Sequence, residues 1–244
     1  MARAPVVDPG GHHTARAVLH GVAVHVLARR RSQVSGRFGL RAVPGGITTP
    51  AFGEGPEVVR ISGDTLFREV AGECSRVRIE GTTLEEIAAL VDADLSTGFD
   101  CGADAPPLGR TDLPLHWPEH AVRTILDWFG LGWRVLDSVV ASQPVGVTSA
   151  TIQLWPEHFD AATTLTLPTG QKVNLGFSPG DGYEPEPYVY AGPWSDARPG
   201  DAAFWNAPFG ALRRYAEVSG AHDPEAECRR FLEEGVRRVA TEAH

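Results

Sequence analysis

Apolar residues recur at helical spacing in the first part of the chain. The pattern predicts a helix over residues 13–31, and the interval 17–28 is apolar on nearly every side. We therefore expect this helix to be buried on more than one face. Its clearest apolar stripe consists of Ala15, Val18, Leu19, Val22 and Val26.

Three short strands are predicted to follow, at about 57–61, 65–70 and 75–79. In the first and third segments arginine alternates with valine or isoleucine. Successive side chains of a strand point to opposite faces, so this alternation predicts a sheet with one buried face and one face in water. The arginines of the pattern are Arg60, Arg76 and Arg78.

A change of composition divides the chain. Residues 96–114 are rich in Gly, Asp and Pro, which is typical of a linker. We therefore predict an N-terminal domain over residues 1–98, made of a helix, a small antiparallel sheet and a second helix. That second helix is capped by Thr82 or Thr83, with glutamates at the capping-box positions. Residues 99–244 form the predicted C-terminal domain, a β-sheet lobe with flanking helices.

Helices flank the β-rich region of the second domain. The first begins near Pro118 and is expected to end at Gly130 and Gly132, with a strand over 133–140 after it. Glycine is common just past the last turn of a helix, and the sequence has two glycines at this point.

The remaining pattern predicts β-structure over residues 149–190, with a hairpin turning at 168–171. Residues 209–218 predict a helix, and Asp223 caps the last helix. Together the patterns predict an α+β protein of two lobes, with mostly antiparallel sheets flanked by helices.

The predicted C-terminal strands have one apolar face and one face that is polar but nearly uncharged. A face of this kind is covered by another part of the protein or lines a cavity, and the pattern leaves both alternatives open. The apolar face holds Ile152, Leu154, Leu165, Leu167, Val173, Leu175, Phe177 and Val189. The polar face holds Thr151, Gln153, Trp155, Thr164, Thr166, Asn174, Tyr188 and Tyr190.

The tetrapeptide Trp-Pro-Glu-His occurs at residues 117–120 and again at 155–158, where it opens a dense polar and aromatic run. If the strands of this region are neighbours, His158, Asp160 and Asp181 meet at one rim of the sheet. A histidine oriented by a carboxylate is a standard general-base pair, so these three are the candidate catalytic residues. The alternative is that Asp160 caps a turn and that His158 packs beneath a tryptophan.

These residues suggest a pocket for a small polar molecule in the C-terminal lobe. One hypothesis is a hydrolase or isomerase that uses His158 as its base. The alternatives are a binding protein without chemistry and a structural protein whose polar face is sealed by the N-terminal lobe. Binding of Zn²⁺ or Fe²⁺ by His158, Asp160 and Asp181 is a weaker alternative, because no compact ligand spacing supports it, and the sequence leaves any cofactor open. The candidate substrate-binding residues are Gln153, Trp155, Glu157, Asn174, Tyr188 and Tyr190.

Charge and composition narrow the range of partners. A formal net charge of -9 argues against a nucleic-acid partner, because a phosphate backbone requires a basic face. No apolar run approaches the roughly 20 residues that cross a bilayer, and the first ten residues lack a secretory-type hydrophobic segment. We expect a cytoplasmic protein without a membrane partner. Three widely spaced cysteines predict no disulfide framework.

Several stretches resemble known sequences. Residues 19–27 and 36–46, which read LHGVAVHVL and GRFGLRAVPGG, resemble a group of uncharacterised actinobacterial proteins. Residues 154–160, 174–181 and 186–188 resemble a related family built on a domain of unknown function. Neither group has an established activity, so the resemblance implies no catalytic residues.

Overall fold

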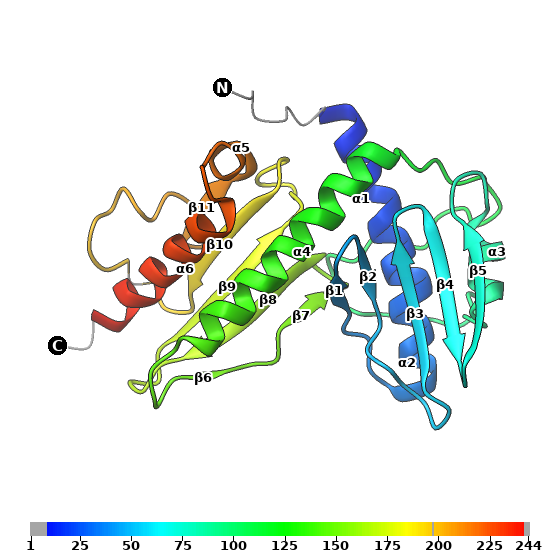
Figure 1. Ribbon diagram of the computed structural model, residues 1–244, viewed down its shortest axis with the longest axis horizontal. Helices are drawn as coiled ribbons and strands as arrows, with labels where there is room; N and C mark the ends of the chain where they lie inside the picture. Colours follow the sequence, from blue (N-terminus) through cyan, green and yellow to red (C-terminus); the bar gives the residue numbers. More distant parts are fainter. Residues whose placement is uncertain (1–8, 197, 242–244) are drawn as a thin grey trace. The chain divides into compact units, whose positions relative to one another are not determined.

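The computed structural model describes residues 9–196 and 198–241 of the chain (Figure 1). Over these residues it is an α+β protein with two antiparallel sheets, one of five strands and one of six, so the predicted fold class is confirmed. The described residues form two compact units. The N-terminal unit contains residues 9–130 and 153–159, and the C-terminal unit contains residues 131–152 and 160–241 apart from 197.

The linker predicted at residues 96–114 lies within the N-terminal unit. Compact units are defined by contact, whereas the predicted division at residue 98 concerns separately folding domains. That division stays a prediction.

A long helical segment opens the N-terminal unit. It consists of α1 (Pro9–Val22), a π-helix η1 (Ala23–Ala28) and α2 (Arg29–Ser35). Every residue of η1 is buried, as expected for a helix that is apolar on all sides. The segment ends at Gly36, whose φ of 69° is the left-handed conformation that glycine supplies at helix ends.

Five antiparallel strands, in the order β1-β2-β3-β4-β5, form the sheet of the N-terminal unit. The register places Arg60, Arg76 and Arg78 on one face, so the predicted wet face is confirmed. The other face holds the fully buried Val59 and Ile61. The strands are β1 (Arg41–Val43), β2 (Gly46–Thr48), β3 (Glu57–Ser62), β4 (Thr65–Val70) and β5 (Glu73–Arg78).

A short helix, α3 (Leu84–Leu90), follows this sheet. Thr83 is its cap, and the Thr83 hydroxyl accepts a hydrogen bond from the Glu86 backbone N–H at 3.2 Å. The Glu86 carboxylate accepts one in return from the Thr83 N–H at 2.9 Å. This reciprocal pair is the predicted capping box.

The helix α4 (Glu119–Ala141) corrects the prediction for this region. It continues through Gly130 and Gly132, and the strand expected over 133–140 is part of the helix. Gly132 is required by packing: a Cβ there would lie 2.5 Å from Cγ of Phe177, so its bare backbone makes room for that ring. The buried residues after it, Val135, Leu136 and Val139, also recur at helical spacing.

Five of the six strands of the second sheet belong to the C-terminal unit, in the order β11-β10-β9-β8-β6, and all their pairings are antiparallel. The predicted hairpin at 168–171 joins β8 to β9. The helix predicted over 209–218 is wrong in its first half, where β11 pairs with β10 instead. The strands are β6 (Thr148–Ser149), β8 (Asp160–Thr166), β9 (Lys172–Ser178), β10 (Tyr188–Pro193) and β11 (Ala211–Arg214).

Two helices complete the chain, α5 (Tyr215–Ser219) and α6 (Pro224–Ala240). Asp223 caps α6 as predicted, because its carboxylate accepts the Ala226 N–H at 3.0 Å. In Figure 1, α6 and the later turns of α4 lie across the same side of β8, β9 and β10. Among the described residues no helix combines the length and the hydropathy that a membrane span requires.

The faces of the C-terminal sheet follow the predicted alternation. The face under the helices contains Leu165, Val173, Leu175, Phe177 and Val189, all fully buried. The register places Thr164, Asn174, Tyr188 and Tyr190 together on the opposite face. Asp160, at the start of β8, and Arg214, at the end of the edge strand β11, also belong to this polar face.

Candidate functional site

The residues predicted to form a site are divided between the two compact units. Gln153, Trp155, Glu157 and His158 belong to the N-terminal unit, where β7 (Gln153–Trp155) pairs at Leu154 with Leu40. The others belong to the C-terminal unit, and each group is described by itself. They are Asp160, Asn174, Asp181, Tyr188 and Tyr190.

The imidazole of His158 lies between two carboxylates. Its Nδ1 is 3.0 Å from Oδ2 of Asp104, and its Nε2 is 3.7 Å from Oε2 of Glu157. The carboxylate bonded to His158 is thus supplied by the Gly- and Asp-rich segment that the sequence analysis interpreted only as a linker. The predicted pairing of His158 with Asp160 or Asp181 joins residues of different units and stays a prediction.

Local backbone geometry positions the carboxylate of Glu157. Gly102 has a φ of 136°, and its N–H donates to Oδ1 of Asp100 at 2.9 Å. A Cβ at Gly102 would overlap the Glu157 carboxylate, so only glycine allows the two loops to approach this closely. Because Gly102 has no side chain, the segment that carries Asp104 can approach Glu157.

The turn that carries Glu157 and His158 is closed and anchored. The N–H of Phe159 donates to the carbonyl of Trp155 at 2.8 Å, and Phe159 adopts a φ of 54°. The buried Phe159 ring stacks on His20, with centroids 4.5 Å apart, and meets Phe129 edge to face. A non-glycine residue in the left-handed region is uncommon, and the packing of this ring holds it there.

Two histidines of the first helical segment bind the loops that form the cluster. Nε2 of His20 donates to the carbonyl of Pro156 at 2.7 Å, and Nε2 of His25 donates to the carbonyl of Pro106 at 2.9 Å. Burial lowers the pKa of His20 to about 4, and burial also lowers the pKa of His25. Both imidazoles are therefore neutral at pH 7, with the proton on Nε2 because a carbonyl only accepts.

Cys101 lies beside this cluster but has the wrong chemistry for a nucleophile. Its thiol is buried, and burial raises its pKa to about 11, with Glu157 and Asp100 adding to the effect. The thiolate is the reactive form of cysteine. Cys101 therefore remains a protonated, inert thiol at neutral pH.

The same cluster has the composition of a cation site. One ligand atom from each of Asp104, Glu157 and His158 lies within 4.8 Å of the others. Two carboxylates and an imidazole suit Zn²⁺ or Fe²⁺. This grouping differs from the weak alternative of His158, Asp160 and Asp181, and the sequence offers no compact spacing for it, because Asp104 lies far along the chain from Glu157 and His158.

The predicted residues of the C-terminal unit form a hydrogen-bonded group. The Tyr190 hydroxyl donates to Asp160, and the Tyr188 hydroxyl donates to Oδ2 of Asp181 at 2.5 Å. Desolvation and the neighbouring carboxylates raise the pKa of both tyrosines. Oδ1 of Asp181 also closes a turn by accepting the N–H of Tyr183 at 2.7 Å. In this arrangement the two aspartates accept hydrogen bonds from phenols that stay neutral.

Asn174 links this polar face to a residue that the sequence analysis missed. Its Oδ1 accepts hydrogen bonds from the Thr164 hydroxyl and from Nε1 of Trp194, both at 2.8 Å. Trp194 follows the end of β10 and is 61% exposed. Its position directly after the polar strand was the available signal, but sequence alone does not separate an exposed tryptophan from a buried one.

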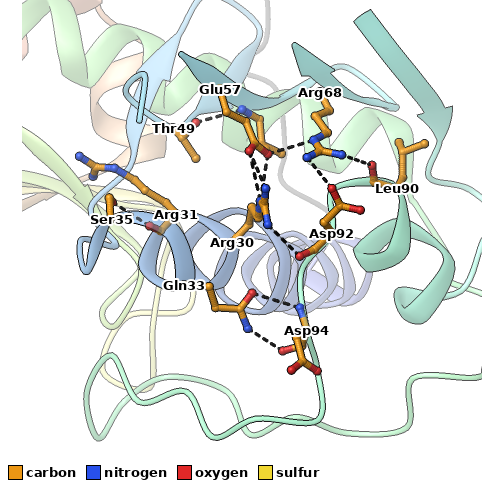
Figure 2. A network of polar contacts seen from close by, with 11 residues as sticks. Arg30, Arg31, Gln33, Ser35, Thr49, Glu57, Arg68, Leu90, Asp92 and Asp94 are labelled. Carbon is orange, nitrogen blue, oxygen red and sulfur yellow. Dashed lines mark hydrogen bonds and ion pairs between the residues drawn. The ribbon is translucent and has the colours of Figure 1, made fainter. Parts of the chain in front are cut away.

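A third polar network, in the N-terminal unit, joins α2 to the end of the sheet (Figure 2). The Glu57 carboxylate is 2.7 Å from Nη2 of Arg30 and 3.0 Å from Nε of Arg68. Arg68 also contacts Asp92 at 2.6 Å. Glu57 is only 4% exposed, so its charge is balanced by two arginines within the fold.

Comparison of the chain with protein-family models, with curated proteins and with solved structures gave no match. The functional assignment therefore rests on the geometry of the clusters described above, and membership of the actinobacterial family suggested by the sequence motifs stays a prediction.

Proposed function

We propose that this protein is an acid–base enzyme, a hydrolase or isomerase acting on a small polar molecule, with His158 as its general base. The observation that carries the proposal is the 3.0 Å contact between His158 Nδ1 and Asp104. A carboxylate only accepts hydrogen bonds, so Nδ1 carries the proton and Nε2 of the neutral ring has the free lone pair. Nε2 is then the basic atom, and Asp104 stabilises the imidazolium that forms.

Glu157 lies on the Nε2 side of the His158 ring, where the proton would be removed. Its Oε2 is 3.7 Å from Nε2, which is too long for a hydrogen bond. Glu157 can therefore accept a hydrogen bond from the molecule whose proton His158 removes. In hydrolysis that molecule is water, and in isomerisation it is the substrate itself, whose proton is removed at one atom and returned at another.

The charge of the cluster limits the substrate. Two carboxylates flank the base, and the chain has a formal net charge of -9. Like charges repel strongly at short distance, so the proposed substrate is neutral or cationic and not phosphorylated. Trp155 and Gln153, which directly precede this turn on β7, are the proposed substrate contacts in the same unit.

A two-stage experiment tests the assignment. A thermal-shift screen of neutral and cationic metabolites first identifies a ligand, and turnover of that ligand is then measured. We expect His158→Gln to lower kcat by about 10²–10⁴-fold, the usual contribution of a general base. Asp104→Asn should lower kcat with little change in KM, because it disturbs the orientation of the base.

A matched control is available in His116, an exposed histidine whose Nδ1 is 3.6 Å from Glu80. His116→Gln should leave turnover unchanged. A His158→Gln variant that turns over the ligand at the wild-type rate would show that His158 is not the base.

A second candidate function is binding without chemistry, with a divalent cation held at the same three side chains. It is favoured by the 4.8 Å grouping of their ligand atoms. Calorimetric titration with Zn²⁺ and Mn²⁺ should then give saturable binding that Glu157→Gln weakens and His116→Gln does not. The two candidates differ in their response to a chelator, which would leave a metal-free general base active.

A further inference from the structure

The polar face of the C-terminal sheet changes character along its strands. At one end Asp160, Ser178 and Tyr188 are buried. At the other end Thr164 pairs with Asn174, and both residues are half-buried. Thr166 and Lys172 form the next pair on the same face. The face is thus closed around the tyrosines and open at the β8–β9 hairpin.

Trp194 is held rigidly at this open end. Its backbone N–H donates to the carbonyl of Lys172 at 3.0 Å, and its Nε1 donates to Asn174 at 2.8 Å. Nζ of Lys172 lies 4.4 Å from the centroid of the indole ring. Trp194 as a residue is nevertheless 61% exposed. A fixed, exposed indole presents a preformed apolar surface at little entropic cost to a ligand.

Hydrogen-bonding groups surround the ring. Oδ1 of Asn174 accepts from both Thr164 and Trp194, so the half-buried Asn174 side chain has its amide nitrogen as a donor for a ligand. The Thr166 hydroxyl and the Lys172 ammonium lie next to it in the sheet. The open end therefore combines one apolar ring, neutral donors and acceptors, and one positive charge.

We propose that this open end is a binding site for a pyranose sugar. A pyranose has an apolar C–H face, which fits the exposed indole, and a rim of hydroxyl groups, which fits the Asn174 amide, the Thr166 hydroxyl and the Lys172 ammonium. A nucleotide is disfavoured because a single ammonium provides little for a phosphate chain. This site is separate from the acid–base proposal, and neither depends on the other.

The probes for the test are glucose, galactose, xylose and N-acetylglucosamine, together with cellobiose and chitobiose. Saturation-transfer NMR and calorimetry on the full chain should detect at least one of them. Trp194→Ala should weaken binding by about tenfold, the upper value for one aromatic contact. Trp194→Phe should have a smaller effect, because it keeps a ring. Trp194 is exposed, so both variants should fold, which circular dichroism checks.

Tyr183 supplies the control, since it is also an exposed aromatic residue of the C-terminal unit. Tyr183→Ala should leave sugar affinity unchanged. The proposal is overturned if none of the six sugars binds, or if Trp194→Ala binds as tightly as the wild-type chain.

A second measurement uses the fact that Lys172 is the only lysine of the sequence. An amine-reactive acetylating reagent modifies this side chain, and mass spectrometry follows its rate. A bound sugar should slow the acetylation of Lys172 severalfold in the wild-type chain and not in Trp194→Ala. Equal rates with and without a sugar that binds would place that sugar elsewhere and would contradict the proposal.

Discussion

The two sheets of this protein differ in the residues that form their polar faces. Each is antiparallel, with one apolar face packed inside its own unit. The solvent-facing side of the N-terminal sheet is charged, with Arg60 paired to Glu69 at 3.2 Å and lying over the ring of Phe67. The polar face of the C-terminal sheet is built mainly from threonine, asparagine and tyrosine, with Asp160, Lys172 and Arg214 as its charged residues.

The difference extends to the way each sheet uses hydrogen bonds. Exposed ion pairs are weak and tolerate change, so the arginine-bearing face is an ordinary solvated surface. Neutral side chains that bond to one another, as Thr164 does with Asn174, have defined geometry and can recognise a ligand. A neutral polar sheet face with exposed aromatic residues is therefore a better indication of binding than a charged one.

The largest expected effect comes from the buried charge network around Glu57, which lies in the N-terminal unit. Glu57→Ala leaves the guanidinium groups of Arg30 and Arg68 without their shared carboxylate. Removing one partner of a buried ion pair costs about 3–5 kcal/mol, and urea denaturation should show a loss of this size. Glu69→Ala removes an exposed pair and should cost less than about 1 kcal/mol. Equal losses would mean that the two networks do not differ.

A smaller effect is expected in the C-terminal sheet, where the buried polar contact is a phenol–carboxylate bond. Tyr190→Phe removes the hydroxyl that donates to Asp160. The loss of a hydrogen bond to a buried charged group costs about 1–3 kcal/mol in the free energy of unfolding. Tyr183→Phe, which alters an exposed ring, should leave that free energy unchanged. If Tyr190→Phe unfolds at the wild-type urea concentration, the bond contributes nothing to stability.

The smallest effect concerns pH, and it should appear in the N-terminal unit. The pKa of His20 is lowered by burial to about 4 in the folded chain, from 6.5. Between these values the unfolded chain binds more protons, so the stabilising contribution is complete above pH 6.5 and is lost as the pH falls toward 4. Since His20 is partly exposed, we expect a change on the order of 1 kcal/mol.

His20→Gln isolates this contribution, because glutamine can still donate to the carbonyl of Pro156. The stability of this variant should fall less steeply than that of the wild-type chain between pH 6.5 and pH 4, as measured by urea denaturation at several pH values. Parallel curves for the two chains would contradict the assignment of the pH dependence to His20.

Local signals predicted much of the fold. The three short strands of the N-terminal sheet, the capping box at Thr83 and Glu86 and the cap at Asp223 depend on residues close together in the sequence, and all are present. The β8–β9 hairpin was also predicted. Periodicity and capping are local properties, so the sequence contains them directly.

The errors and omissions come from distant contacts. Gly132 was predicted to end a helix, but it lies inside α4, where its bare backbone makes room for the Phe177 ring of β9. The strand β11 forms because it pairs with β10. In both places tertiary contact overrides local preference.

The candidate site was only partly predictable for the same reason. His158 and Glu157 were singled out by the repeated Trp-Pro-Glu-His motif, but the partner of His158 is 54 residues away, at Asp104. The asparagine and the tyrosines of the C-terminal sheet follow from alternation along the strands. The exposure of Trp194 depends on which other residues cover the end of β10, and the local sequence pattern does not contain that information.

The π-helix η1 accommodates one extra residue within the first helical segment, because each of its hydrogen bonds spans one residue more than an α-helical bond. Shortening Ala23–Ala28 by one residue would therefore convert this stretch to regular α-helix and leave the direction of α2 unchanged, so Arg30 would still face Glu57. Deleting one residue from a regular turn of α1 would instead rotate the following residues by about 100° and separate the two side chains.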